Sequence, residues 1–274
     1  MRNEPFYVRK PTAPEVPLLV SIPHTGTEVP PSISSRFASR DIEMLPDTDW
    51  HLHQLYEFVP SLGARTICAR YSRYVIDLNR PPDSTPLYPG RQETGLVPTA
   101  TFHGVPIYRA GAEPTADEIA ERRRECWEPY HAALTEELQR IKAKWGYALL
   151  FDAHSITSVV PSVWDGPLPG LMLGDVDGTS AAPEISDAVY AVHQQSGFTF
   201  QKNRPYKGGY ITRHFGRPSE NVHALQLEMS QRLYMDEGLP FRYRTDLAEK
   251  LIPTLAATLR AFIESGARRH GGAR

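Results

Sequence analysis

The chain has 274 residues, 41% of them apolar and 23% charged, which is the composition of a globular protein with a sizeable core. Its formal net charge of −2 gives no support to a nucleic-acid or anionic-membrane partner, because such surfaces usually need a concentrated positive field. No run of about 18 apolar residues predicts a membrane span, and the N-terminus lacks the apolar stretch of a secretory signal, so we expect a cytoplasmic protein.

Six short apolar segments, most of them bounded by turn residues, are predicted to be β-strands. They lie at residues 16–22, 65–69, 74–78, 147–151, 171–173 and 224–227. Several of them are apolar at consecutive positions, as strands that are buried on both faces must be.

Helical patterns separate these segments. Apolar residues recur at helical spacing in 50–59, 183–196 and 245–265. The clearest helix begins at Thr115, which forms a capping box with Glu118. Its apolar face continues to residue 141, and Pro129 is expected to kink or split it because proline removes an intrahelical hydrogen bond.

Alternating helices and strands predict one α/β domain over residues 1–274, with three α/β/α layers and a mainly parallel or mixed central sheet. No internal repeat or linker divides the chain. The segment 80–114 shows little regular pattern and is expected to form a long loop region over one end of the sheet, where the active sites of α/β proteins usually lie.

Two of the predicted strands end close to a histidine. His24 follows the first, and His154 follows the strand at 147–151, with Asp152 between strand and histidine. Histidines at the ends of neighbouring strands can converge on one ion, and neutral imidazole is the commonest metal ligand. Asp152 could orient the imidazole ring. The alternative is that each histidine only forms structural hydrogen bonds at the end of its strand.

Acids and histidines alternate where the helix at 50–59 should begin. Asp47 has a simple explanation as a helix cap. Asp49 could instead supply the oxygen ligand of a His/Asp/His zinc site, since catalytic zinc uses three protein ligands and keeps a position open for water. His51 and His53 are two residues apart and cannot share a helix face. Both are expected to be surface or packing residues.

Glu228 follows the last predicted strand, where an unpaired carboxylate is costly. A general base beside a metal site would explain it, and a salt bridge to an arginine explains it equally well. The two cysteines, Cys68 and Cys126, are far apart and lie in apolar patterns, so neither a disulfide nor a soft metal site is expected.

Arginines lie near the same strand ends. Arg73 and Arg80 flank an apolar run, and a Gly-Gly turn that includes Gly209 leads to Arg213. Arginine binds carboxylates through a planar fork with two parallel hydrogen bonds, so these residues are candidates to bind an anionic substrate. The glycines do not form a phosphate loop, because the Gly-rich strand-to-helix signature of such loops is absent.

Taken together, these motifs resemble the N-formylglutamate amidohydrolase family over roughly residues 15 to 235. The resemblance rests on SIPHTG at 21–26, DTDW at 47–50, RYVIDLNR at 73–80, PYH at 129–131, FDAHS at 151–155, KGGY at 207–210 and QLE at 226–228. It implies a phosphorylase/hydrolase-like fold similar to that of zinc carboxypeptidases. It also implies a small-molecule substrate, N-formyl-L-glutamate, which is hydrolysed to formate and L-glutamate in histidine degradation.

The resemblance further implies a divalent metal, with Zn²⁺ as the first choice. His24 and His154 are the expected imidazole ligands, and Glu228 is the expected general base. In carboxypeptidase-like relatives an acidic ligand follows the first histidine closely. In this sequence the nearest acid after His24 is Glu28, which lies one residue too far for that spacing. Asp49 is therefore the preferred oxygen ligand, and Glu28 is the reserve.

The remaining roles implied by the resemblance concern the substrate. Arg73, Arg80 and Arg213 are candidates to bind its carboxylates, together with Asn79 and Gly209. His131 is a candidate to stabilise the tetrahedral oxyanion or to hold a ligand in place. Because His131 is predicted to lie on a helix beside core residues, it could equally be structural.

Two other interpretations remain. The first is a related zinc deacylase or carboxypeptidase-like hydrolase that acts on another N-acyl amino acid and has a roomier pocket beside the metal. The second is an inactive relative that binds an anionic ligand without stoichiometric metal. A serine hydrolase is disfavoured because no Gly-x-Ser-x-Gly elbow occurs, although Ser155 follows His154.

Overall fold

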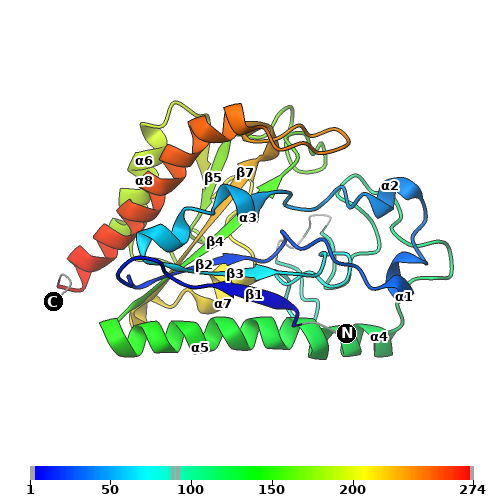
Figure 1. Ribbon diagram of the computed structural model, residues 1–274, viewed down its shortest axis with the longest axis horizontal. Coiled ribbons are helices and arrows are strands. Elements are labelled where there is room, and N and C mark those ends of the chain that lie inside the picture. The colour runs from blue at the N-terminus through cyan, green and yellow to red at the C-terminus, as the bar shows by residue number, and fades with distance from the viewer. Residues whose placement is uncertain (1–3, 88–89, 91–92, 272–274) are drawn as a thin grey trace.

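The computed structural model describes residues 4–271 except 88–89 and 91–92, and within them a mixed seven-stranded sheet with flanking helices (Figure 1). The α/β class and the mixed sheet predicted from sequence are therefore confirmed. The strands follow one another across the sheet in the order β1 (Phe6–Arg9), β3 (Arg65–Ala69), β2 (Leu18–Ile22), β4 (Ala148–Ile156), β7 (Val222–Ser230), β5 (Leu171–Gly174) and β6 (Phe200–Lys202).

The centre of the sheet is parallel. Strands β3, β2, β4 and β7 run in the same direction, whereas β1 and β5 are antiparallel to β3 and β7. The two longest strands, β4 and β7, pair over their whole length, and His154 lies opposite Glu228 in their register. Because the four central strands run in parallel, their carboxyl ends meet at one edge of the sheet.

The helices of the described residues are α1 (Pro31–Ser34), α2 (Arg40–Glu43), α3 (Leu52–Leu55), α4 (Ala116–Arg122), α5 (Glu128–Trp145), α6 (Pro183–Gln194), α7 (Tyr210–Phe215) and α8 (Thr245–Arg269). A π-helical turn spans Arg123–Trp127, and short 3-10 turns lie at Val59–Leu62, Pro218–Glu220 and Gln231–Leu233. None of the helices in the described part of the chain has the length and apolar character that a membrane crossing requires.

Alternate residues of the central strands pack into two different apolar clusters. Along β2, Leu18 and Val20 belong to the cluster that includes α3, α6 and α8, and Leu19 belongs to the cluster that includes α5 and α7. Strand side chains alternate between the two faces of a sheet, so each cluster covers one face. Figure 1 shows α5 along one side of the sheet and α6 and α8 on the other.

Several expected elements differ from those observed. The segment 74–78 forms turns and no strand, because Arg73 and Asp77 are committed to buried hydrogen bonds that bend the chain. The helix expected at 50–59 is reduced to α3 and a 3-10 turn. Strands β1 and β6 were not predicted from the sequence.

The capping box at Thr115 is confirmed, and the helix that follows is interrupted as expected. The interruption is the π-helical turn at Arg123–Trp127, which lies ahead of Pro129. Pro129 itself lies in the first turn of α5, where proline is well tolerated, so the distortion is taken up before the proline.

Candidate active site

A cavity of about 320 Å³ lies where the central strands end. His24 is two residues beyond β2, His154 lies near the end of β4, and Glu228 lies near the end of β7. All three side chains line the cavity. The sheet therefore brings together residues that are far apart in the sequence, at the edge where α/β proteins usually bind ligands.

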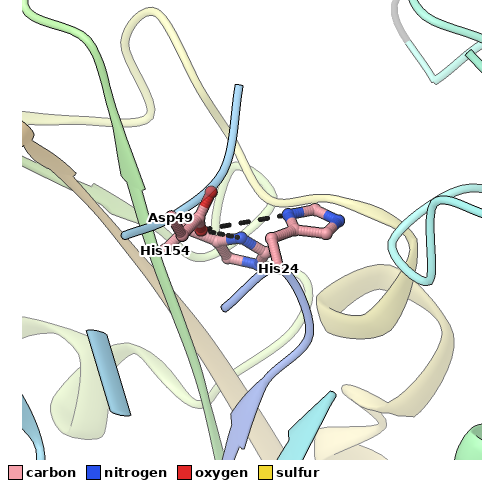
Figure 2. A group of neighbouring side chains, drawn as sticks. All are labelled: His24, Asp49 and His154. Atoms are coloured by element: carbon pink, nitrogen blue, oxygen red, sulfur yellow. Dashed lines mark ion pairs between the residues drawn. The ribbon is translucent and has the colours of Figure 1, made fainter. Parts of the chain in front are cut away.

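His24, Asp49 and His154 form a buried group that could hold a metal ion (Figure 2). One donor atom from each residue lies within 4.8 Å of the other two. Nδ1 of His154 is 3.3 Å from Oδ2 of Asp49, and Nδ1 of His24 is 3.9 Å from the same oxygen. The backbone N–H of Ser155 donates to this oxygen over 3.0 Å and fixes its position.

Both imidazole rings are held from behind by a carboxylate. Nε2 of His24 is 2.7 Å from Oδ1 of Asp77, and Nε2 of His154 is 2.9 Å from Oδ2 of Asp152. Each Nε2 then donates to a carboxylate, so that Nδ1 is the atom directed at Asp49. Carboxylates that hold the far nitrogen of a histidine are typical of metal sites. Two imidazole nitrogens and one carboxylate oxygen fit a divalent ion such as zinc.

The electrostatics of the group follow from burial and close charges. Burial opposes ionisation of Asp77, but His24 and Arg73 hold the pKa of this carboxyl well below its usual range. Burial and the Arg73 guanidinium lower the pKa of His24. Burial alone would lower the pKa of His154, yet Asp152 and Asp49 raise it well above its usual value.

Glu228 lies beside this group. Strand register places it opposite His154, and side chains at paired positions of neighbouring strands project from the same face of the sheet. Burial raises the pKa of Glu228 to about 8, against the opposing effect of His154. A carboxyl group with a pKa close to neutrality can both accept and donate a proton, which is what general acid–base chemistry needs.

Arg73 and Asn79 also line the cavity, and both contact the histidines. Nη2 of Arg73 lies 3.0 Å from Nδ1 of His24 and donates to Oδ2 of Asp77 over 3.0 Å. Nδ2 of Asn79 lies 2.9 Å from Nε2 of His154. Both residues are buried, so these contacts are protected from water.

Arg80 and Gly209 complete the set of predicted residues found at the cavity. Arg80 donates from Nε to the carbonyl oxygen of Thr94 over 2.9 Å, which holds its guanidinium at the cavity wall. Gly209 approaches Asn79 so closely that a Cβ atom on Gly209 would lie 2.3 Å from Nδ2 of Asn79.

The structure does not bring His131 and Arg213 to the wall of this cavity. Nε2 of His131 donates to the carbonyl oxygen of Leu78 over 2.8 Å, and its ring stacks against Trp127 with a centroid distance of 3.8 Å. Arg213 donates from Nε to the carbonyl oxygen of Gly208. Each residue instead supports a loop that carries cavity residues.

Four other acidic and histidine candidates lie outside the metal-binding group. Glu28 is exposed and lies outside the group, so Asp49 is the acid that meets the histidines. Asp47 does not cap the helix, because its Oδ2 accepts from the backbone N–H of Phe102. His51 contacts the carbonyl oxygen of Phe241, and His53 contacts Thr25, as expected for packing residues.

Sequence reasoning did not assign a role to Asp77, the carboxylate that holds His24 from behind. Its signal lay in the segment 73–80, where an acid four residues after Arg73 interrupts an apolar run. Both cysteines, Cys68 and Cys126, are buried.

Comparisons with known proteins identify the family to which the chain is similar. The family model of N-formylglutamate amidohydrolase matches residues 16–235. The N-formylglutamate deformylase of Pseudomonas aeruginosa is 46% identical over 256 residues, which cover 93% of this chain and 96% of that protein. The N-formylglutamate deformylase of Pseudomonas putida is 43% identical over 256 residues, which cover 93% of this chain and 95% of that protein. The crystal structure of N-formylglutamate amidohydrolase from Ralstonia eutropha JMP134 superposes with a TM-score of 0.82 at 29% identity, and covers 98% of this chain and 100% of that chain.

Proposed function

The chain belongs to the N-formylglutamate amidohydrolase family, and on that premise we propose that it hydrolyses N-formyl-L-glutamate to formate and L-glutamate. The observation that carries the proposal is the cavity in which His24, Asp49 and His154 lie beside Glu228. A metal-binding group next to a carboxyl of raised pKa is suited to hydrolysis of an amide bond.

In this proposal His24, Asp49 and His154 hold a divalent ion, for which Zn²⁺ is the first choice. The support is chemical: two neutral imidazole nitrogens and one carboxylate oxygen are the ligands of many catalytic zinc sites. A bound ion supplies Lewis-acid chemistry that polarises the formyl carbonyl and acidifies water. Asp77 and Asp152 keep the two rings oriented for this purpose.

Glu228 is assigned the role of general base and then general acid. It takes a proton from the attacking water as the oxygen adds to the formyl carbon. It then delivers this proton to the amine nitrogen as the C–N bond breaks, so that formate and L-glutamate leave. Its position opposite His154 in the pairing of β4 and β7 places Glu228 beside the three proposed ligands, where both transfers take place.

The cavity arginines and Asn79 are assigned to the substrate, which carries two carboxylates. Arg80 has the more accessible guanidinium of the two cavity arginines and is suited to a carboxylate of the glutamate. Arg73 is buried next to His24 and is suited to the carbonyl end of the substrate. His131 and Arg213 are retained only as positioning residues, because neither lines the cavity.

The finer description of the fold belongs to the same proposal. We assign the chain to the three-layer α/β/α, phosphorylase/hydrolase-like folds that include zinc carboxypeptidases, as one domain over residues 1–274. Two apolar clusters on opposite faces of one sheet support the layers. A sheet whose strands come from residues 6 to 230 supports the single domain.

The proposal is tested by measuring formate release from N-formyl-L-glutamate by the purified protein, with and without a chelator. N-acetyl- and N-succinyl-L-glutamate are measured in parallel. We expect formate release that the chelator abolishes and added Zn²⁺ restores. A clear preference for one of the two larger acyl groups would instead favour a related deacylase, and activity that resists metal removal would overturn the metal-assisted mechanism.

A further inference from the structure

An apolar wall closes one side of the cavity next to the metal-binding group. It consists of Phe102, Ile156, Val160, Val163 and Tyr206, which line the cavity and belong to a small apolar cluster separate from the two large ones. The rest of the cavity lining is mostly polar, with Arg73, Arg80 and Thr94 among its members. The cavity therefore offers two chemically different surfaces to one substrate.

Two short connections place this wall beside the metal-binding group. Ile156 lies two residues after His154 on β4, so both side chains project from the same face of the sheet. The ring of Phe102 is 4.7 Å from Cζ of Arg73, whose Nη2 is 3.0 Å from Nδ1 of His24. Ile156 and Phe102 therefore place one end of the wall next to the metal-binding group.

The chemistry of the substrate decides which of its groups can face this wall. N-formyl-L-glutamate carries two carboxylates, and burying a carboxylate against apolar side chains without a partner is strongly unfavourable. The uncharged parts are the two side-chain methylene groups and the acyl substituent. Only the acyl substituent is bonded to the carbonyl carbon itself, and in the formyl group it is a single hydrogen. A wall in contact with that hydrogen leaves no room for a methyl group.

The central part of the wall comes from a closed loop at residues 158–168. The backbone N–H of Leu168 donates to the carbonyl oxygen of Ser158 over 2.7 Å and closes the neck of the loop. Within the loop, the N–H of Val163 donates to the carbonyl oxygen of Val160. Val160 is 2% exposed and faces the cavity, whereas its neighbour Val159 is 46% exposed and does not line it.

Glu237 fixes this loop from the segment that follows β7. Its Oε1 accepts from the backbone N–H groups of Ser158, over 2.7 Å, and Arg232, over 3.0 Å. Its Oε2 accepts from the hydroxyl of Ser158 over 2.5 Å. Arg232 in turn donates from Nη2 to the carbonyl oxygen of Leu168. Both ends of the loop are therefore attached to the same segment.

We propose that the loop at 158–168 determines the size of the acyl group that the enzyme accepts, through Val160, and that Glu237 is the positioning residue that holds the loop against the metal-binding group. The inference rests on the proposed function, because it concerns the acyl group of the same reaction. The inference attributes the restriction to a formyl group to Val160, held in place by Glu237.

The test is the ratio of kcat/KM for N-acetyl-L-glutamate to kcat/KM for N-formyl-L-glutamate, which does not depend on the fraction of active protein. In Val160→Ala we expect this ratio to rise at least about tenfold, since one methyl or methylene group in an apolar pocket typically changes discrimination by that much. Glu237→Ala is expected to change the ratio in the same direction. Val159→Ala is the matched control, in the same loop, and should leave the ratio unchanged.

An unchanged ratio in Val160→Ala, with formate release retained, would overturn the inference and leave the proposed function standing. A loss of kcat/KM that is equal for both substrates would also overturn it, because the wall would then contact the glutamate part. A ratio unchanged in Glu237→Ala alone would remove the positioning role of Glu237. Absence of formate release in the unmodified protein would overturn the proposed function itself.

Discussion

Asp77 links the backbone of Asn79 to His24 of the metal-binding group. It accepts from Nε2 of His24, from the Arg73 guanidinium and from the backbone N–H of Asn79. Removing its charge in Asp77→Asn should weaken the hold on His24 and lower Zn²⁺ affinity about 10- to 100-fold. Competition with a chromophoric chelator measures this affinity. The exposed carboxylate of Asp187 provides the control, and equal affinity in Asp77→Asn and Asp187→Asn would contradict the role.

Substitutions of Glu228 and of the two histidines should differ in their effects on metal content. Glu228→Gln keeps the shape of the side chain but cannot take a proton, so we expect normal metal content and turnover about 10²- to 10⁴-fold lower. His24→Ala and His154→Ala should lose both metal and turnover. Elemental analysis and formate release measure the two quantities, with the exposed Glu220→Gln as control. Full turnover in Glu228→Gln would remove it as the base.

His131 gives the protein a predictable dependence on pH. Burial lowers the pKa of His131 to about 3, and its buried Nδ1 has no hydrogen-bond partner among the residues that the structure describes, so a second proton finds no acceptor there. The pKa in the folded state lies below that in the unfolded state, about 6.5. Protons therefore bind more readily to the unfolded chain, and stability is lost as the pH falls through this window.

The variant His131→Gln, which keeps a donor for Leu78, removes this dependence. Between pH 7 and pH 5 the free energy of unfolding of the unmodified protein should fall by about 2 kcal/mol more than that of the variant. Urea unfolding at the two pH values measures the difference. Identical losses in both proteins would mean that His131 does not carry the effect.

At the level of residues, the sequence predicted much of the candidate site, and its errors have physical causes. His24 and His154 lie together because the parallel strands β2 and β4 are neighbours. Asp49 reaches them from the segment before α3, where its backbone N–H donates to the carbonyl oxygen of His24. The residue type and the PYH motif at 129–131 make His131 a candidate to stabilise the oxyanion. Only the packing of α5 shows that its ring faces Trp127 and the backbone. Side-chain direction of this kind depends on tertiary contacts that a single sequence does not encode locally.

At the level of elements, the turn before α7 depends on the absence of a side chain at Gly209. The φ angle of Gly209 is −81°, so its conformation is open to any residue, and the constraint is the contact with Asn79. Gly209→Ala should displace Asn79 from His154 and lower kcat/KM about 10²-fold, as small misplacements of a site residue do. Gly238→Ala is the control, because no atom of the described residues lies within 4 Å of the added methyl. Equal activity of the two variants would show that Asn79 tolerates the shift.

Some elements match the sequence prediction closely and others do not. The strands at 65–69 and 171–174 and the helix from Thr245 agree closely with expectation. The segment 74–78 has the composition of a strand, yet it forms turns, and these turns bring Arg73 and Asp77 into an ion pair. Strands β1 and β6 lie at the edges of the sheet and are four and three residues long, which leaves little periodicity to detect.

For the whole molecule, an ion that binds only the folded chain must stabilise it. At a free Zn²⁺ concentration 100 times the dissociation constant, this contribution is about 2.7 kcal/mol. For a chain of this size we expect a chelator to lower Tm by about 5 °C or more. Differential scanning calorimetry measures the shift. His24→Ala should melt at the same temperature with and without the chelator, and an equal shift in this variant would place the ion elsewhere.

The metal-binding group draws its donors from both halves of the chain, and this separation has a consequence for synthesis. While the ribosome has delivered only β1, β2 and β3, His24 and Asp49 exist without His154, and the strand that carries Glu228 is still unmade. A nascent chain at this stage cannot acquire the ion at the complete group. An ion held by all three residues would therefore bind only after β4 has been made and has paired with β2.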